Sequence, residues 1–121
     1  MDDAQARSEA EQLHAELFGE PDSGQEAHLV DTLTVITVAE WCVLAIVSGM
    51  LGNAVYDWVK TQVAALVAGL FKRKGAGVRA ELEERIFQEL KRVKKKKAIT
   101  LADADLRLRA KALLDEIDAA Q

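Results

Sequence analysis

Two carboxylates, Glu40 and Asp57, are the acids within the apolar part of this chain, residues 32–71. Paired carboxylates in an apolar setting can share a proton or line a path for ions. The alternative is that each is a charge at a helix end, with Asp57 pairing with Lys60 one turn on. Neither interpretation supplies a nucleophile with its base.

The other reactive side chains do not form a recognisable site. His14, His28 and Cys42 lack metal-ligand spacing, and no CxxC or HxxxH motif occurs. We expect both histidines to be ordinary surface or loop residues and Cys42 to be a small core hydrophobe. The glycines of residues 75–77 are too few for a phosphate-binding loop. The sequence therefore predicts a non-enzymatic function, with no catalytic residues, metal or cofactor.

An apolar stretch, residues 29–71, determines how the other elements of the chain are arranged, because it has to be hidden from water. Between residues 32 and 56 the only charged side chain is Glu40. Residues 41–59 would span about 28 Å as a helix, close to the roughly 30 Å hydrocarbon core of a bilayer. Trp41 at one end, and Tyr56 with Trp58 at the other, match interfacial aromatic belts. These features predict a membrane span, with the basic C-terminal part in the cytoplasm.

The alternative is that other helices of the protein shield this stretch. Gly52 is expected to end one helix and Asn53 to cap the next. Residues 40–71 are therefore predicted to form either one long helix or a hairpin broken at residues 52–53. In the second case the protein would be a soluble, cytoplasmic helical domain with the apolar segment as its buried core.

The whole chain is predicted to be all-α, with four to five helices. Amphipathic helices are expected at about residues 2–18, 78–97 and 101–118, from apolar residues at three- and four-residue spacing. Gly19 is expected to end the first helix and Thr100 to cap the last. Residues 30–38 are rich in β-branched side chains and could form a short strand.

This pattern predicts three regions along the chain. Residues 1–28 form an acidic amphipathic helix and linker, residues 29–74 the apolar central segment, and residues 75–121 an amphipathic helical pair. The acidic N-terminus is not followed by an apolar run, so a secretory signal peptide is not expected.

Small residues four apart allow helices to approach closely. This spacing predicts a helix-association site at Ala45, Ser48, Gly49 and Gly52. We therefore expect the protein to self-associate as a homo-oligomer. It would be either a membrane anchor or pore-forming oligomer, or a soluble adaptor or oligomerisation domain that mediates protein–protein interaction.

The net charge of −4 hides an asymmetry. Residues 1–40 carry ten acids against Arg7, giving −9, whereas residues 41–121 carry fifteen Lys and Arg against ten acids, giving +5. The expected contacts for anionic lipid or a partner are Lys72, Arg73, Lys74, Lys91, Arg92, Lys94, Lys95, Lys96 and Lys97. The alternative is a solvated helix end favoured by the helix dipole. Nucleic acid is disfavoured, because no aromatics alternate with these cations, and no small-molecule ligand is indicated.

Overall fold

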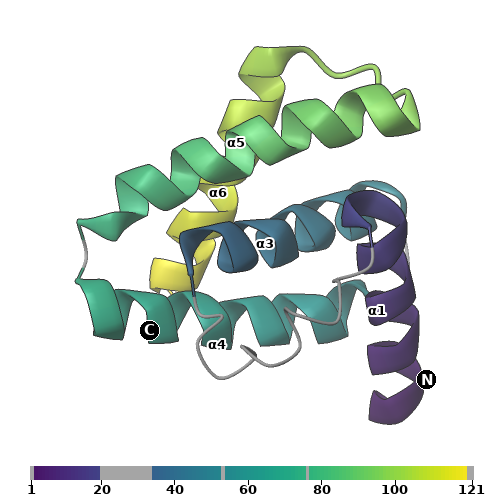
Figure 1. Ribbon diagram of the computed structural model, residues 1–121, viewed down its shortest axis with the longest axis horizontal. Coiled ribbons are helices and arrows are strands. Elements are labelled where there is room, and N and C mark those ends of the chain that lie inside the picture. The colour runs from purple at the N-terminus through teal and green to yellow at the C-terminus, as the bar shows by residue number, and fades with distance from the viewer. Residues whose placement is uncertain (1, 20–33, 53, 76, 120–121) are drawn as a thin grey trace.

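The computed structural model describes residues 2–19, 34–52, 54–75 and 77–119, which form five α-helices (Figure 1). The helices are α1 (Asp3–Phe18), α3 (Val35–Met50), α4 (Tyr56–Lys74), α5 (Val78–Lys97) and α6 (Asp103–Ala119). The described ranges contain no strand. The predicted all-α class is therefore confirmed.

The strand suggested for residues 30–38 is wrong wherever the structure describes that segment. Residues 30–33 lie outside the described ranges, and residues 35–38 are the first turn of α3. Thr34 caps this helix, because its Oγ1 accepts a hydrogen bond from the backbone N–H of Thr37 at 3.2 Å. β-branched side chains lower helix propensity by only tenths of a kcal/mol per residue. The stabilisation from burying side chains such as Val38 outweighs this cost.

Helix α3 is the centre of the molecule. All seven residues from 42 to 48 are buried, and seven residues complete about two helical turns, so α3 is covered on every side at its middle. Figure 1 shows α3 lying between α4 and α5, with α1 across one end and α6 crossing behind, and α3 contacts all four. The uniformly apolar sequence is thus the pattern of a fully buried helix.

The candidate membrane span, residues 41–59, is not one helix. Helix α3 ends at Met50 and α4 begins at Tyr56, and α4 runs back antiparallel along α3 (Figure 1). Gly52 has a φ of +65°, which glycine adopts readily, and its N–H donates to the Gly49 carbonyl at 3.3 Å. The hairpin is therefore the form that the structure shows, although the predicted cap at Asn53 lies outside the described residues. In the described ranges, no helix combines the length and the apolar character that a bilayer crossing requires.

The amphipathic helices bury the faces that their spacing predicts. The buried residues on these faces are Ala6, Ala10 and Leu17 of α1, Val78, Leu82, Ile86, Leu90 and Val93 of α5, and Leu106, Ala110, Leu113 and Ile117 of α6. Gly19 ends α1 as expected, with its N–H donating to the Ala15 carbonyl at 2.8 Å.

Helix α6 starts later than predicted, so Thr100 is not its cap. The helix begins at Asp103, and the Ala102 carbonyl accepts the first hydrogen bonds, from the N–H groups of Asp105 and Leu106. Leu101 packs against the core just before this point, and residues 99–102 are not helical.

Candidate functional site

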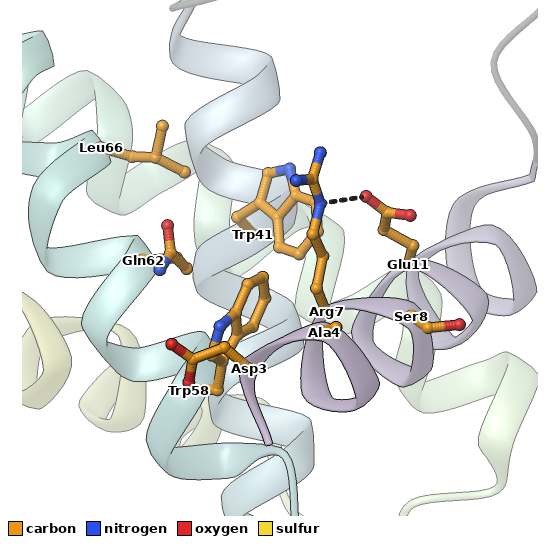
Figure 2. Close-up of a pocket in the computed structure, with 9 residues that line it drawn as sticks. All are labelled: Asp3, Ala4, Arg7, Ser8, Glu11, Trp41, Trp58, Gln62 and Leu66. Carbon is orange, nitrogen blue, oxygen red and sulfur yellow. Dashed lines mark hydrogen bonds and ion pairs between the residues drawn. The ribbon is translucent and has the colours of Figure 1, made fainter. Parts of the chain in front are cut away.

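A groove of about 760 Å³ lies between α1, α3 and α4 and is here called the Trp groove (Figure 2). It is lined by Asp3, Ala4, Arg7, Ser8 and Glu11 of α1, Trp41 of α3, and Trp58, Gln62 and Leu66 of α4. Figure 2 shows Trp41 reaching from α3 and Trp58 from α4 toward α1. Both indoles are only partly buried.

Small side chains on α1 create the Trp groove. Helix α1 packs on α3 and α4 with Ala6 and Ala10 buried beneath it. Because alanine fills little space, α1 lies close to its neighbours along a narrow line, and the larger indoles remain at the side of this contact. On the rim, Arg7 Nε lies 3.1 Å from Glu11 Oε1, one turn apart on the exposed side of α1.

The Trp groove has the composition of a recognition surface. Its apolar floor consists of Trp41, Trp58 and Leu66, which are partly exposed, and its rim is polar and charged. Tryptophan and arginine are the residue types that most often dominate binding energy at protein interfaces, where an apolar centre is surrounded by a polar rim.

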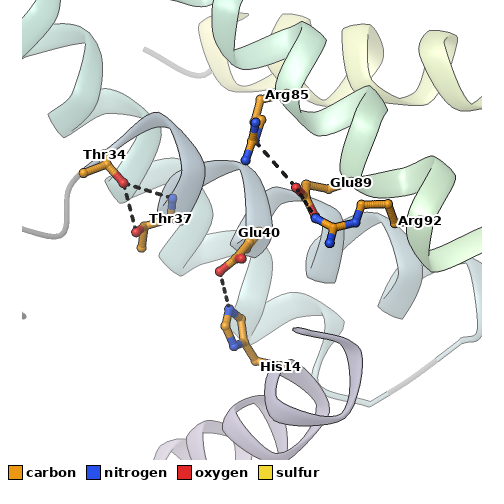
Figure 3. A network of polar contacts seen from close by, with 7 residues as sticks. All are labelled: His14, Thr34, Thr37, Glu40, Arg85, Glu89 and Arg92. Atoms are coloured by element: carbon orange, nitrogen blue, oxygen red, sulfur yellow. Dashed lines mark hydrogen bonds and ion pairs between the residues drawn. The ribbon is translucent and has the colours of Figure 1, made fainter. Parts of the chain in front are cut away.

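A cluster around His14 supports Trp41. The His14 ring stacks on the Trp41 ring, with centroids 4.7 Å apart and planes at 26°, and lies 5.0 Å from the Phe18 ring. Its Nε2 is 3.4 Å from Glu40 Oε1, although the geometry is not that of a hydrogen bond (Figure 3). The His14 side chain is only 17% exposed, so it is partly buried in a packed cluster instead of being the ordinary surface residue that we expected.

The sequence contained a signal for this position. His14 lies four residues after Ala10 and three before Leu17, on the face of α1 that is buried. His28 lies outside the described residues. Cys42 is buried, as expected for a small core hydrophobe, and burial raises the pKa of its thiol.

The two carboxylates of the apolar segment are not brought together. Glu40 faces His14, which is near the C-terminal end of α1. Asp57 lines a second hollow together with Asp3, which is at the N-terminal end of α1. Eleven residues of helix, about 16 Å, separate these two points on α1. Asp57 is a helix-end charge in the first turn of α4. Its expected partner Lys60 instead pairs with Glu116 of α6.

One buried acid was missed from the sequence. Glu89 of α5 is 3% exposed, and Arg92 Nη1 donates to its two carboxylate oxygens at 3.2 and 3.3 Å, while Arg85 Nε lies 3.6 Å away (Figure 3). It also lines a cavity of about 510 Å³ with Glu40 and Lys96. Glu89 follows Ile86 by three residues and precedes Val93 by four, so it lies on the buried face of its helix.

The predicted helix-association residues make contacts within this chain. Ala45 and Ser48 are buried in α3. Gly49 lies against the Tyr56 ring, so closely that a Cβ at position 49 would be 2.9 Å from Tyr56 Cε1. Gly52 forms the turn between α3 and α4. Close helix packing thus occurs within the hairpin, and self-association through these four residues stays a prediction.

The basic residues form two separate groups rather than one patch. Lys72, Arg73 and Lys74 are exposed at the end of α4, and residues 91–97 lie at the far end of α5. Residues 78–90 of α5, about 20 Å of helix, lie between the groups (Figure 1).

Several cations of the second group hold helices together. Lys97 pairs with Glu16, Lys96 Nζ donates to the Leu17 carbonyl at 3.2 Å, and Lys94 Nζ lies 3.4 Å from Asp103 Oδ1. The cluster thereby ties α5 to α1 and to the start of α6. Lys91 lies over the Phe87 ring at 5.4 Å. Contact of either group with anionic lipid or a partner stays a prediction.

Comparison with protein-family models, curated proteins and solved structures gives no match for this chain. The function must therefore be inferred from the geometry of the site itself.

Proposed function

We propose that this protein is a non-enzymatic helical interaction module that binds a helical segment of a partner protein in the Trp groove. One observation carries the proposal. The chain buries residues 42–48 of α3 on every side, yet it leaves Trp41, Trp58 and Leu66 partly exposed in a single groove with a polar rim.

The shape of the Trp groove favours insertion of side chains from a partner. Its volume of about 760 Å³ lies within the usual range of binding pockets, and it runs between two helices that form its walls. Helical segments commonly bind by placing apolar side chains, spaced three and four residues apart, in such a groove. Trp41 and Trp58 provide large apolar contact surfaces, and Gln62 and Ser8 can donate and accept hydrogen bonds at the edge.

The burial of α3 also favours an adaptor over the membrane anchor predicted from the sequence. Residues 42–48 are already covered by helices of the same chain, so this segment does not need lipid to shield it. We therefore place the binding surface on the outside of the bundle, with the apolar segment as its core.

Selection of helical peptides from a displayed random library on the full-length protein tests the proposal. We expect enriched peptides whose affinity falls about tenfold or more in the Leu66→Glu variant, which puts a charge on the apolar floor of the groove. Leu108→Glu is the matched control, because Leu108 is 64% exposed on α6, away from the groove. Circular dichroism confirms that both variants fold. No enrichment, or equal binding by both variants, contradicts the proposal.

A further inference from the structure

Trp58 lies between two hollows. On one side is the Trp groove, and on the other is a hollow of about 480 Å³ lined by Asp3, Ala6, Ala54, Asp57, Trp58, Thr61 and Gln62. Trp58, Gln62 and Asp3 line both hollows. A partner that contacts Trp58 therefore meets the two carboxylates of Asp3 and Asp57 as well.

The charge around Trp58 is negative and not compensated. Asp3 and Asp57 are exposed, and neither carboxylate belongs to an ion pair within the described ranges. Among the described residues that line the Trp groove, the one cation is Arg7, which is paired with Glu11 at 3.1 Å.

This arrangement suits a cationic side chain next to an apolar one. An ammonium or guanidinium group is attracted to carboxylates and also to the face of an indole ring. The methylene stem of Lys or Arg can lie along apolar surface while its charged end stays in water. Farther along the groove, Trp41 and Leu66 offer apolar surface, and the carboxylate that lines this part, Glu11, is paired with Arg7.

We propose that the occupant of the Trp groove is a basic amphipathic helix of a partner protein. Its apolar side chains contact Trp41 and Leu66, and a Lys or Arg near one end contacts Asp3 and Asp57 beside Trp58. This inference rests on the proposed function and adds the chemical class of the partner to it.

Intrinsic fluorescence can test this directly, because the two tryptophans of the protein, Trp41 and Trp58, both line the groove. The probe is a Trp-free peptide of about 16 residues, long enough to form a helix, with leucine on one face and lysine on the other. A matched peptide carries glutamate in place of lysine. We expect a saturable blue shift of emission and binding about tenfold tighter for the lysine peptide at low salt, with the difference shrinking as salt screens the charges.

Charge variants assign the preference to particular residues. The double variant Asp3→Asn and Asp57→Asn is expected to lower the ratio of the two affinities about fivefold. The matched control is Glu81→Gln with Asp105→Asn, which removes two exposed acids on α5 and α6. It should leave the ratio unchanged.

The outcomes separate this inference from the proposed function. If both peptides bind equally and Leu66→Glu abolishes both, the groove binds helices but the preference for basic partners is wrong. An unchanged ratio in the Asp3 and Asp57 variant also overturns it. Self-association that Leu66→Glu abolishes and that the peptide competes with would assign the groove to a second copy of this chain. If no peptide alters the fluorescence and the library yields none, both proposals fail.

Discussion

Helices α3 and α1 both contribute to the Trp groove, but the chain holds them very differently. Helix α3 is covered by four other helices, with nine buried residues. Helix α1 contacts α3 and α4 and buries Ala6, Ala10 and Leu17. Burying a Val, Leu or Ile contributes about 1.5–3 kcal/mol, whereas the methyl of an alanine contributes about 0.8 kcal/mol. Packing therefore fixes α3 much more strongly than α1.

The two ends of α1 also differ. At its C-terminal end, Glu16 pairs with Lys97, and His14 stacks on Trp41. At its N-terminal end, which forms one wall of the Trp groove, the buried contacts are those of Ala6 and Ala10. The groove thus has a firmly packed floor and a lightly packed wall.

The largest effect is expected in α3. Leu44→Ala should lower the free energy of unfolding by about 3 kcal/mol, because Leu44 is fully buried and its removal leaves a cavity in the centre of the bundle. Chemical denaturation followed by circular dichroism measures this. Leu108→Ala on the exposed face of α6 is the control, with an expected change below about 0.5 kcal/mol. Equal effects would show that α3 is not the principal core element.

The next effect concerns the turn between α3 and α4. Gly49→Leu should cost about 2 kcal/mol, because the new side chain must displace the Tyr56 ring, which leaves no room for even a Cβ. In a Tyr56→Ala background the same substitution should cost much less. The double-mutant cycle from denaturation curves measures this coupling. Strictly additive effects would mean that Gly49 and Tyr56 do not pack against each other.

Sedimentation of Gly49→Leu also tests self-association through Gly49, since an unchanged oligomeric state counts against it.

A smaller and local effect is expected in α1. Ala10→Leu should loosen α1 at a cost of about 1 kcal/mol, because a leucine does not fit under the helix where Ala10 is fully buried. Hydrogen exchange should become faster in α1 and remain slow in α3. Gln12→Leu, on the exposed side of α1, is the matched control. Faster exchange in both helices would show that they unfold as one unit and would remove the contrast between them.

Much of the fold follows from the spacing of apolar residues. The buried faces of α5 and α6 and the end of α1 at Gly19 could be predicted, because one-sided helices reveal their core face by periodicity. The environment of α3 could not. A helix that is apolar on all sides is equally suited to a lipid bilayer and to the interior of a helical bundle. Only the tertiary contacts distinguish these two environments.

The site was harder to predict than the fold. The sequence alone indicates Trp41 and Trp58 as membrane-interface residues, whereas in the structure they line one groove because the chain reverses at Gly52. Their proximity depends on the hairpin and on where α1 docks, neither of which local spacing determines. His14 and Glu89 could have been found, since both lie at three- and four-residue spacing from buried residues. Their polar character concealed this.

The smallest effect concerns Cys42, at the buried middle of α3. Burial raises the pKa of its thiol above the value of about 8.5 typical of an unfolded chain, so above that pH the unfolded state loses this proton while the folded state keeps it. Stability is therefore lost as pH rises, by about 0.8 kcal/mol between pH 7.5 and pH 9. Denaturation curves of the wild type and Cys42→Ala isolate this term, because the other titrating groups are common to both. Parallel pH dependences would mean that water reaches the centre of α3, and the contrast with α1 would then be lost.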